Sequence, residues 1–184
     1  MKQTRCDRSG RRIFSFADLS HLLGRAGREG MSNRMKNPAE VIPQAYKGIG
    51  NLLAAVADGG LPETTTELIA MRVSSLNGCA ACLQGHAVRV EEVGLPIEKI
   101  VGLAAYRESP FFSEAEKAAL ALADAVTRLA DSEDAVPDEL WREVTKHYDE
   151  RQTAALILCI ATHNLFNRVN VTVREDAENP FWMR

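Results

Sequence analysis

The chain has 184 residues, of which 46% are hydrophobic and 26% are charged, as expected for one globular domain large enough to bury a core. The formal net charge of −3 gives no electrostatic reason to expect a nucleic-acid partner or an anionic membrane. No apolar run approaches the roughly 18–20 residues that cross a bilayer, and no secretory signal is recognisable, so we expect a cytoplasmic protein with no membrane or nucleic-acid partner.

The first 30 residues differ in character from the rest of the chain. They contain seven basic residues, three acidic residues and four glycines. We expect residues 1–30 to be a poorly ordered basic extension, residues 31–176 to form the folded domain, and residues 177–184 to be a C-terminal tail.

Apolar side chains recur at helical spacing through the first part of this domain. Residues 38–58 are predicted to form one helix, whose inward face comprises Val41, Ile42, Ala45, Ile49, Leu52, Leu53 and Val56. A second helix is predicted over residues 62–76 and a third over residues 79–93. The dipeptide Asn77-Gly78 separates them as a break signal.

The second half of the chain is also predicted to be helical. A short helix is expected over residues 97–106, and Ser113 with Glu116 forms a capping box for a long helix over residues 114–130. A helix after Pro137 would turn Leu140, Trp141 and Val144 inward. The last helix, over residues 150–173, is apolar nearly all round at its start, so it is buried on all sides or partly by a neighbouring subunit. The fold is therefore predicted to be all-α, with about six to seven helices.

The stretch from Glu67 to Val90 carries the residues that could support chemistry. Cys79, Cys82 and His86 stand at i, i+3 and i+7 of the predicted third helix, so all three project from one face. Two thiols at this spacing can close a disulfide, and the first turn of a helix favours thiolate over thiol. His86 could take the proton of Cys82, and Glu67 could hydrogen-bond the imidazole and set its tautomer. We therefore predict a thiol redox site.

Other interpretations of the cysteine pair are weaker. The two cysteines could simply be small buried residues. They could join His86 in a zinc site, but a structural zinc takes four ligands, and only Cys159 or Glu67 could complete the set. Attached c-type haem requires a histidine directly after the second cysteine, where this chain has leucine. A thioredoxin-like motif would follow a strand, whereas a helix is predicted here.

The last helix carries a second group of polar residues. Cys159 and His163 stand at i and i+4, but the surrounding run is so apolar that we prefer to interpret Cys159 as a packed thiol. Asn164, Asn167 and Arg168 could border the site or pair across a subunit interface.

The arrangement of Glu67, Cys79, Cys82 and His86 resembles the core motif of the AhpD-like alkylhydroperoxidases, within the carboxymuconolactone decarboxylase superfamily. The similarity covers about residues 31–173 and includes the stretches RVSSLNGCAACLQGH, AAYRESPFFSEAEKAALALADAVTRLAD and IATHNLFNRVNV. It implies an all-helical subunit that assembles into homo-oligomers and acts as a thiol-dependent peroxidase, with no cofactor and no metal.

The resemblance also implies a role for each of the four residues. Cys82 matches the thiol that attacks a hydroperoxide, Cys79 matches the resolving thiol, and His86 with Glu67 matches the proton relay. A dithiol reductant, either a lipoyl-bearing or a thioredoxin-like protein, would reset the pair. The residues themselves leave the division of labour open, because the helix dipole favours Cys79 as the lower-pKa thiol, whereas His86 favours Cys82. We prefer Cys82 as the attacking thiol.

One position departs from the family pattern. The better-defined peroxidases carry a second histidine directly before the latter cysteine, and this chain has Ala81 there. The change removes a possible donor to the peroxide but leaves the dithiol intact. Two alternatives stay open: a redox-responsive helical oligomer without significant turnover, and a decarboxylase-like lyase acting through His86 and Glu67. The decarboxylases of the superfamily generally lack the cysteine pair, which counts against a lyase.

Overall fold

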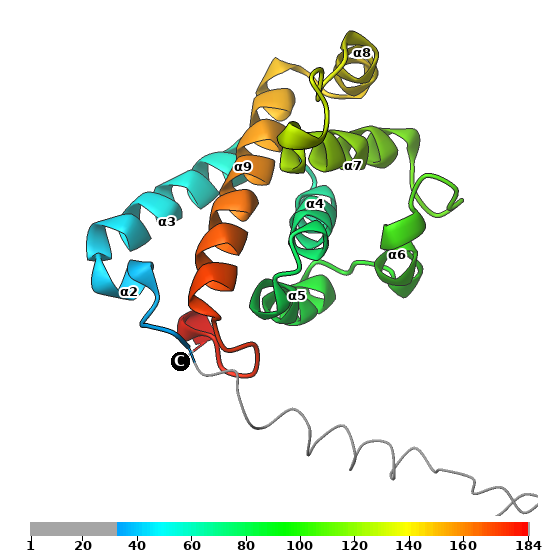
Figure 1. Ribbon diagram of the computed structural model, residues 1–184. Helices are drawn as coiled ribbons and strands as arrows, with labels where there is room; N and C mark the ends of the chain where they lie inside the picture. Colours follow the sequence, from blue (N-terminus) through cyan, green and yellow to red (C-terminus); the bar gives the residue numbers. More distant parts are fainter. Residues whose placement is uncertain (1–32, 184) are drawn as a thin grey trace, which may run out of the picture. The chain divides into compact units, whose positions relative to one another are not determined.

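The computed structural model describes residues 33–183, whose regular secondary structure is entirely helical (Figure 1). The elements are α2 (Pro38–Val41), α3 (Pro43–Asp58), α4 (Glu63–Leu76), α5 (Ala80–Glu92), α6 (Ile97–Gly102), η1 (Leu103–Ala105), α7 (Glu114–Thr127), η2 (Leu129–Asp131), α8 (Asp138–His147), α9 (Glu150–Val173) and η3 (Phe181–Met183). The predicted all-α fold is confirmed. The expected basic extension over residues 1–30 lies outside the described residues. Among the helices of residues 33–183, none has the length and apolar character needed to span a membrane.

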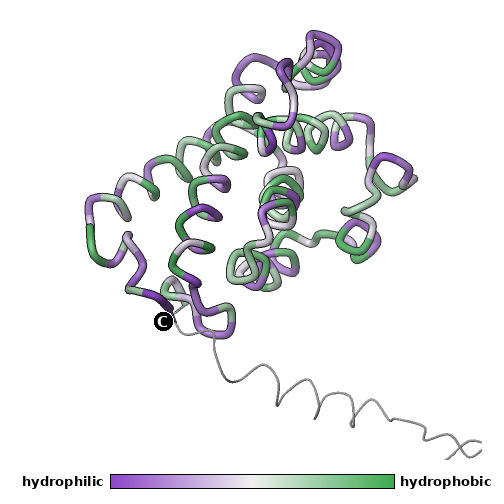
Figure 2. Tube along the Cα trace, viewed as in Figure 1, coloured by the Kyte–Doolittle hydropathy of each residue, from purple (hydrophilic) through white to green (hydrophobic). Residues whose placement is uncertain are grey.

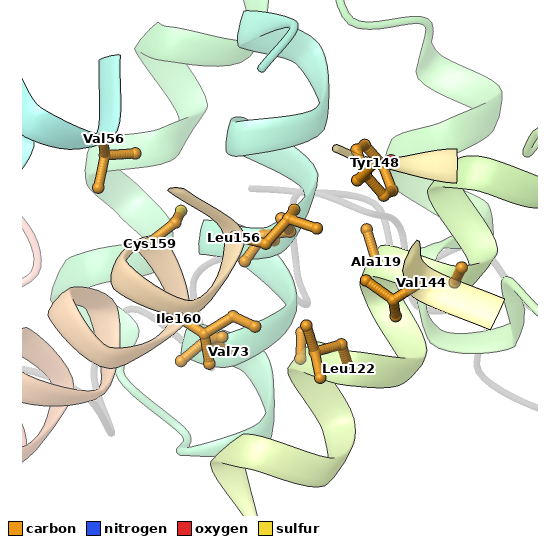
Figure 3. Close-up of a cluster of buried hydrophobic side chains, with 12 residues drawn as sticks. Val56, Val73, Ala119, Leu122, Val144, Tyr148, Leu156, Cys159 and Ile160 are labelled. Atoms are coloured by element: carbon orange, nitrogen blue, oxygen red, sulfur yellow. The ribbon is translucent and has the colours of Figure 1, made fainter. Parts of the chain in front are cut away.

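Helix α4 lies at the centre of the fold and packs against α5, α7 and α9 (Figure 1). Ile69 and Val73 of α4 are fully buried in the larger core cluster, where side chains from α7, α8 and α9 meet them (Figure 3). Leu68 points into a smaller cluster with Leu103 and Leu120. Full burial of each such side chain contributes about 1.5–3 kcal/mol to the stability of the fold. Helix α4 is therefore held firmly in place, and with it the residues at its C-terminal end.

Helices α7 and α9 each begin where polar side chains satisfy the first backbone N–H groups. Ser113 Oγ accepts from the backbone N–H of Glu116 at 3.2 Å, and the Glu116 carboxylate accepts from the backbone N–H of Ser113 at 2.9 Å. The predicted capping box at the start of α7 is therefore confirmed. Asp149 and Gln152 form the same reciprocal pair at the start of α9. Such caps typically contribute about 1 kcal/mol each.

The single helix predicted over residues 38–58 is wrong, because the chain forms two helices that meet at Ile42. Proline has no backbone N–H, and its ring forces the preceding residue out of helical geometry. Ile42, which precedes Pro43, accordingly has φ −120° and ψ 88°. Pro43 then occupies the first position of α3, where a missing N–H costs nothing.

Helices α3 and α9 each carry large apolar side chains that the described residues leave exposed. Of the residues predicted to face inward along α3, only Val56 is buried, whereas Ile42 is 55% and Leu53 is 42% exposed. On α9, Ile157 and Leu158 are each 38% exposed. Figure 2 shows hydrophobic residues along both helices. Burial on all sides is therefore wrong for the start of α9, and cover by a neighbouring subunit stays a prediction.

Helix α8 turns a narrow face towards the larger core. Val144 is fully buried there, and Tyr148, which follows the helix, is 6% exposed and donates its hydroxyl to the backbone oxygen of Ala115 at 3.0 Å. Trp141 was predicted to face inward, and this is wrong, because its side chain is 43% exposed. The α8 side chains that meet the core are Val144 and the partly buried Leu140.

The chain after α9 folds back over the helices rather than extending away. Pro180 is buried and precedes η3, and the Phe181 ring meets the Tyr46 ring edge to face at 6.2 Å between centroids. The next side chain, Trp182, lies against α5 so closely that a Cβ at Gly85 would stand 3.3 Å from the indole nitrogen. The segment predicted to be a C-terminal tail thus contacts the helix that carries the cysteine pair.

Candidate functional site

A tight turn between α4 and α5 positions the cysteine pair. Gly78 has φ +65°, in the left-handed region that glycine adopts without strain. The backbone N–H of Cys79 then donates to the Ser74 oxygen at 3.0 Å, which closes the end of α4. As a result α5 begins immediately after the turn, with Cys79 as its N-cap residue. The predicted position of Cys79 at a helix start is confirmed.

Cys79 and Cys82 are joined by a disulfide, with their Cα atoms 5.3 Å apart. Cys79 Sγ also accepts from the backbone N–H of Cys82 at 3.3 Å, so the first turn of α5 supplies one donor to that sulfur. Cys79 is 1% exposed and Cys82 is 8% exposed, so solvent reaches the second cysteine more readily. The pair can therefore store and release two electrons at a nearly enclosed position.

Glu67 on α4 and His86 on α5 form the second contact of the site. Glu67 Oε1 lies 2.7 Å from His86 Nδ1, and the two side chains are 8% and 13% exposed. A carboxylate oxygen accepts, so Nδ1 carries the proton that is donated to it, and Nε2 of the neutral imidazole is left with a lone pair. His86 is thereby prepared to accept a proton through Nε2.

Two asparagines of α9 contact the sulfur of Cys82. Nδ2 of Asn167 lies 3.1 Å from Cys82 Sγ, and Nδ2 of Asn170 lies 3.4 Å from it. Both asparagines are buried. The sequence suggested Asn167 as a residue that could border the site, but it gave no role to Asn170. Their spacing is the available signal, since Asn164, Asn167 and Asn170 recur every three residues along one side of the helix.

Cys159 and His163 lie close to the Glu67–His86 pair but are not part of it. Cys159 is fully buried in the larger core, and burial raises the pKa of its thiol to about 12. Burial also lowers the pKa of His163 to about 4, so its imidazole is neutral at pH 7. His163 Nδ1 donates to the Cys159 backbone oxygen at 2.9 Å, and its ring centroid lies 5.8 Å from that of His86. The interpretation of Cys159 as a packed thiol agrees with this burial.

The four predicted site residues thus come together as two bonded pairs on α4 and α5, while their catalytic roles stay predictions. Ala81, at the position of the family histidine, is 3% exposed. The zinc alternative gains no support, because no three histidine, cysteine or acidic side chains within residues 33–183 are grouped so as to hold a metal ion. The arrangement combines a dithiol, a base and two N–H donors at one sulfur.

The chain is similar to known proteins across this region. The model of the carboxymuconolactone decarboxylase family matches residues 43–125, which include the cysteine pair, Glu67 and His86. The uncharacterized protein YdfG of Bacillus subtilis is 36% identical over 134 residues, covering 73% of this chain and 90% of YdfG. The uncharacterized protein YnjA of Escherichia coli is 27% identical over 110 residues, covering 60% of this chain and 59% of YnjA.

Solved structures share the fold. A protein of unknown function from Agrobacterium tumefaciens, with a suggested AhpD antioxidant defence role, superposes with a TM-score of 0.72 at 31% identity, covering 79% of this chain and 97% of that one. The debrominase Bmp8 without ligand gives a TM-score of 0.63 at 26% identity, covering 73% and 71% of the two chains. A cysteine-to-alanine variant of Bmp8 bound to 2,3,4-tribromopyrrole gives 0.66 at 24% identity, which shows likeness of fold alone.

Proposed function

Since this chain belongs to the carboxymuconolactone decarboxylase family, we propose that it is a thiol-dependent peroxidase of the AhpD-like type. The observation that carries the proposal is the Cys79–Cys82 disulfide next to a carboxylate–imidazole pair. A dithiol beside a base is the arrangement that activates a thiol as nucleophile and then captures its oxidised form.

The proposed cycle begins with the reduced pair. His86 takes the proton of Cys82, and the thiolate attacks one oxygen of a hydroperoxide, so that the O–O bond breaks and the alcohol leaves with a proton. Sulfur is oxidised to a sulfenic acid and the peroxide is reduced. The Cys79 thiol then attacks the sulfenic sulfur, which forms the disulfide and releases water. A dithiol reductant, lipoyl-bearing or thioredoxin-like, returns the pair to thiols by exchange.

The exposure of the two sulfurs supports this division of labour. Cys82 is 8% exposed and Cys79 is 1% exposed, so a small peroxide would reach Cys82 first. His86 stands one turn after Cys82 on α5, on the same side of the helix, where its Nε2 lone pair is available. The helix-start position of Cys79 suits a resolving thiol, which needs only to approach Cys82.

Steady-state peroxide turnover tests the proposal. Cumene hydroperoxide or hydrogen peroxide would be supplied with dihydrolipoamide or reduced thioredoxin as reductant. We expect Cys79→Ser and Cys82→Ser to lose dithiol-dependent turnover, while Cys159→Ala, which removes a core thiol, keeps it. Full turnover in both site variants would overturn the proposal.

A second candidate function follows from the similarity to the debrominase Bmp8. A dithiol could also reduce a halogenated aromatic compound: the carbon–bromine bond breaks, carbon gains a hydrogen, bromide leaves, and the two thiols become a disulfide. Bromide release from 2,3,4-tribromopyrrole by the reduced protein, measured beside peroxide turnover, separates the two activities. Release that exceeds peroxide turnover would favour the dehalogenase.

The two remaining alternatives make different predictions in the same assay. A redox-responsive oligomer would oxidise once and consume no reductant continuously. A lyase acting through His86 and Glu67 would keep its activity after both site cysteines are replaced. Continuous reductant consumption that depends on both cysteines contradicts both alternatives.

A further inference from the structure

Two carboxamides of α9 turn their N–H groups, rather than their oxygens, towards the sulfur of Cys82. The contacts are 3.1 Å from Asn167 Nδ2 and 3.4 Å from Asn170 Nδ2. A carboxamide can be turned by 180° with little change of shape, and an oxygen would then face the sulfur. The neighbours of each asparagine decide which end does so, and two separate chains of hydrogen bonds reach the same result.

The first chain of hydrogen bonds starts at Arg168. A guanidinium group only donates, and Arg168 Nη1 lies 2.7 Å from Asn164 Oδ1, which fixes that oxygen as an acceptor. Asn77 Nδ2 therefore donates to Asn164 Oδ1 at 3.0 Å, and its second N–H donates to Asn167 Oδ1 at 2.9 Å. Because the oxygen of Asn167 is used in this way, its Nδ2 donates instead, to Ser74 Oγ at 3.1 Å and to Cys82 Sγ.

The second chain of hydrogen bonds starts at Asn37, before α2. Asn37 Oδ1 accepts from the backbone N–H of Ala39 at 3.1 Å, so its nitrogen must donate elsewhere. That nitrogen lies 3.1 Å from Glu175 Oε2 and 2.9 Å from Asn170 Oδ1. The oxygen of Asn170 is thereby used as an acceptor, and its nitrogen is left to donate to Cys82.

Burial gives these contacts their strength. Asn37 and Asn167 are each 1% exposed and Asn170 is 7% exposed, so little water competes for the sulfur. Hydrogen bonds to an anion are stronger than neutral ones, and more so in a low-dielectric interior. A disulfide sulfur accepts weakly, whereas a thiolate accepts strongly, so both contacts gain strength when the disulfide is reduced.

We propose that Asn167 and Asn170 stabilise the thiolate of Cys82 in the reduced protein and thereby select Cys82, rather than Cys79, as the nucleophile. The nucleophilic role rests on the proposed function, whereas the stabilisation itself does not. Cys79 Sγ receives one N–H, from the backbone of Cys82. The sequence left the choice between the two cysteines open, and the two additional donors at Cys82 decide it.

The charged groups around Cys82 act differently from these amides. His86 lies on the same helix and favours the thiolate when it is protonated, while Glu67 from α4 opposes it. Glu175 is linked to the sulfur through Asn37 and Asn170. The two amides do not titrate, so their contribution to the thiolate is the same at every pH.

The test measures the pKa of the Cys82 thiol in the full-length Cys79→Ser variant. The rate of alkylation by iodoacetamide is followed against pH, and mass spectrometry of the Cys82 peptide separates this thiol from the remaining cysteines. Asn167→Asp keeps the shape and the oxygen that accepts from Asn77, but it replaces the donor with a carboxylate oxygen. We expect it to raise the pKa of Cys82 by about 1–2, the range for hydrogen bonds to charged groups.

Three further variants complete the design. Asn170→Asp should raise the pKa of Cys82 by less, because its contact is longer. Asn170→Leu removes the donor without adding charge and should also raise the pKa; it carries the test if Asn167→Asp does not fold by circular dichroism. Asn51→Asp is the control, because it makes the same substitution at an exposed residue of α3 that belongs to neither chain of hydrogen bonds. We expect it to leave the pKa of Cys82 unchanged.

An unchanged pKa of Cys82 in Asn167→Asp and Asn170→Leu would overturn the inference, as would an equal rise in Asn51→Asp. The measurement uses no peroxide, so it is independent of the proposed function. A raised pKa in a protein whose wild type lacks peroxide turnover would refute the peroxidase and leave the stabilisation by Asn167 and Asn170 intact. Normal peroxide turnover of the wild type, together with an unchanged pKa of Cys82 in the asparagine variants, would support the peroxidase and refute the stabilisation by Asn167 and Asn170.

Discussion

Glu67 Oε1 and His86 Nδ1 lie 2.7 Å apart although 19 positions separate the two residues in the chain. The contact joins α4 to α5, which follow one another across the turn at Gly78. It therefore links the central helix of the fold to the helix that carries the cysteine pair. It holds the proton on Nδ1 and leaves Nε2 to act as base.

Replacing Glu67 by glutamine should slow peroxide turnover. The amide can present either N–H or oxygen to Nδ1, so it no longer holds the imidazole in one tautomer. We expect kcat to fall on the order of tenfold to a hundredfold, as when the partner that orients a functional histidine is removed. Glu63→Gln is the control, since Glu63 is on the same helix but 73% exposed, in an ion pair with Arg89. Equal turnover in the two variants would contradict the role of Glu67.

Cys159 should resist alkylation under conditions in which reduced Cys82 reacts. Its side chain is fully buried and burial raises its pKa to about 12, so neither access nor thiolate is available at pH 8. Iodoacetamide labelling of the reduced native protein, followed by peptide mass spectrometry, should find the Cys82 peptide modified and the Cys159 peptide unmodified. Unfolding in guanidinium chloride should make the two react equally. Labelling of Cys159 in the native protein at the rate of Cys82 would contradict its burial.

Acidification below neutral pH should destabilise the protein through His163. The unfolded imidazole binds a proton below pH 6.5, whereas the folded one does so only below about 4, because it is buried. Unfolding therefore takes up a proton between these values, and stability falls as pH falls. From pH 7 to pH 5 the loss is about 2 kcal/mol. Among the partly buried carboxylates, Asp124 and Glu116 have lowered pKa values, and they lose their contributions to stability only below about pH 4.5.

Urea unfolding at pH 7 and pH 5 measures this loss. His163→Gln keeps a donor for the Cys159 backbone oxygen but does not titrate, so its stability should change much less between the two values. If the wild type and His163→Gln lost the same free energy of unfolding, another group would be responsible.

We expect a second copy of this chain to cover the exposed apolar side chains of α3 and α9. Helix α3 has only two charged residues, Lys47 and Asp58, and the family resemblance implies homo-oligomers. Leu53→Glu would place an unpaired charge in such an interface and should shift the protein to monomer. Leu129→Glu changes a leucine that is 57% exposed on η2 and should leave the oligomer intact. Light scattering after size-exclusion chromatography gives the masses, and a monomeric wild type would contradict the expectation.

Local signals in the sequence predicted most of the helices. The capping box of Ser113 and Glu116, the break at Asn77-Gly78 and the apolar spacing each act within a few residues, and each appears in the structure where it was predicted. The division at Pro43 was missed because the apolar spacing continues across it. Spacing reports that a helix has an apolar face, but it does not report what covers that face, which is why Leu53 and Trp141 were expected to be buried.

At the candidate site, too, local sequence patterns did not predict the contacts between residues that are distant in the chain. Cys79, Cys82 and His86 lie within one turn or two of each other, so spacing alone placed them on one face. Glu67 lies one helix earlier, so its contact with the His86 imidazole was suggested by the residue types and by the family motif rather than by spacing. The contacts of Asn167 and Asn170 with Cys82 join residues 85 and 88 positions apart. They depend on how α9 crosses α5, which no local pattern contains.

The position of Trp182 has a practical consequence for anyone handling the protein. The indole lies against Gly85, the residue directly before His86. A purification tag or fluorescent fusion joined directly after Trp182 would therefore be attached beside the helix that holds the dithiol. Rates measured on such a fusion should be compared with those of the protein after cleavage of the tag, because the attached sequence becomes a neighbour of the site.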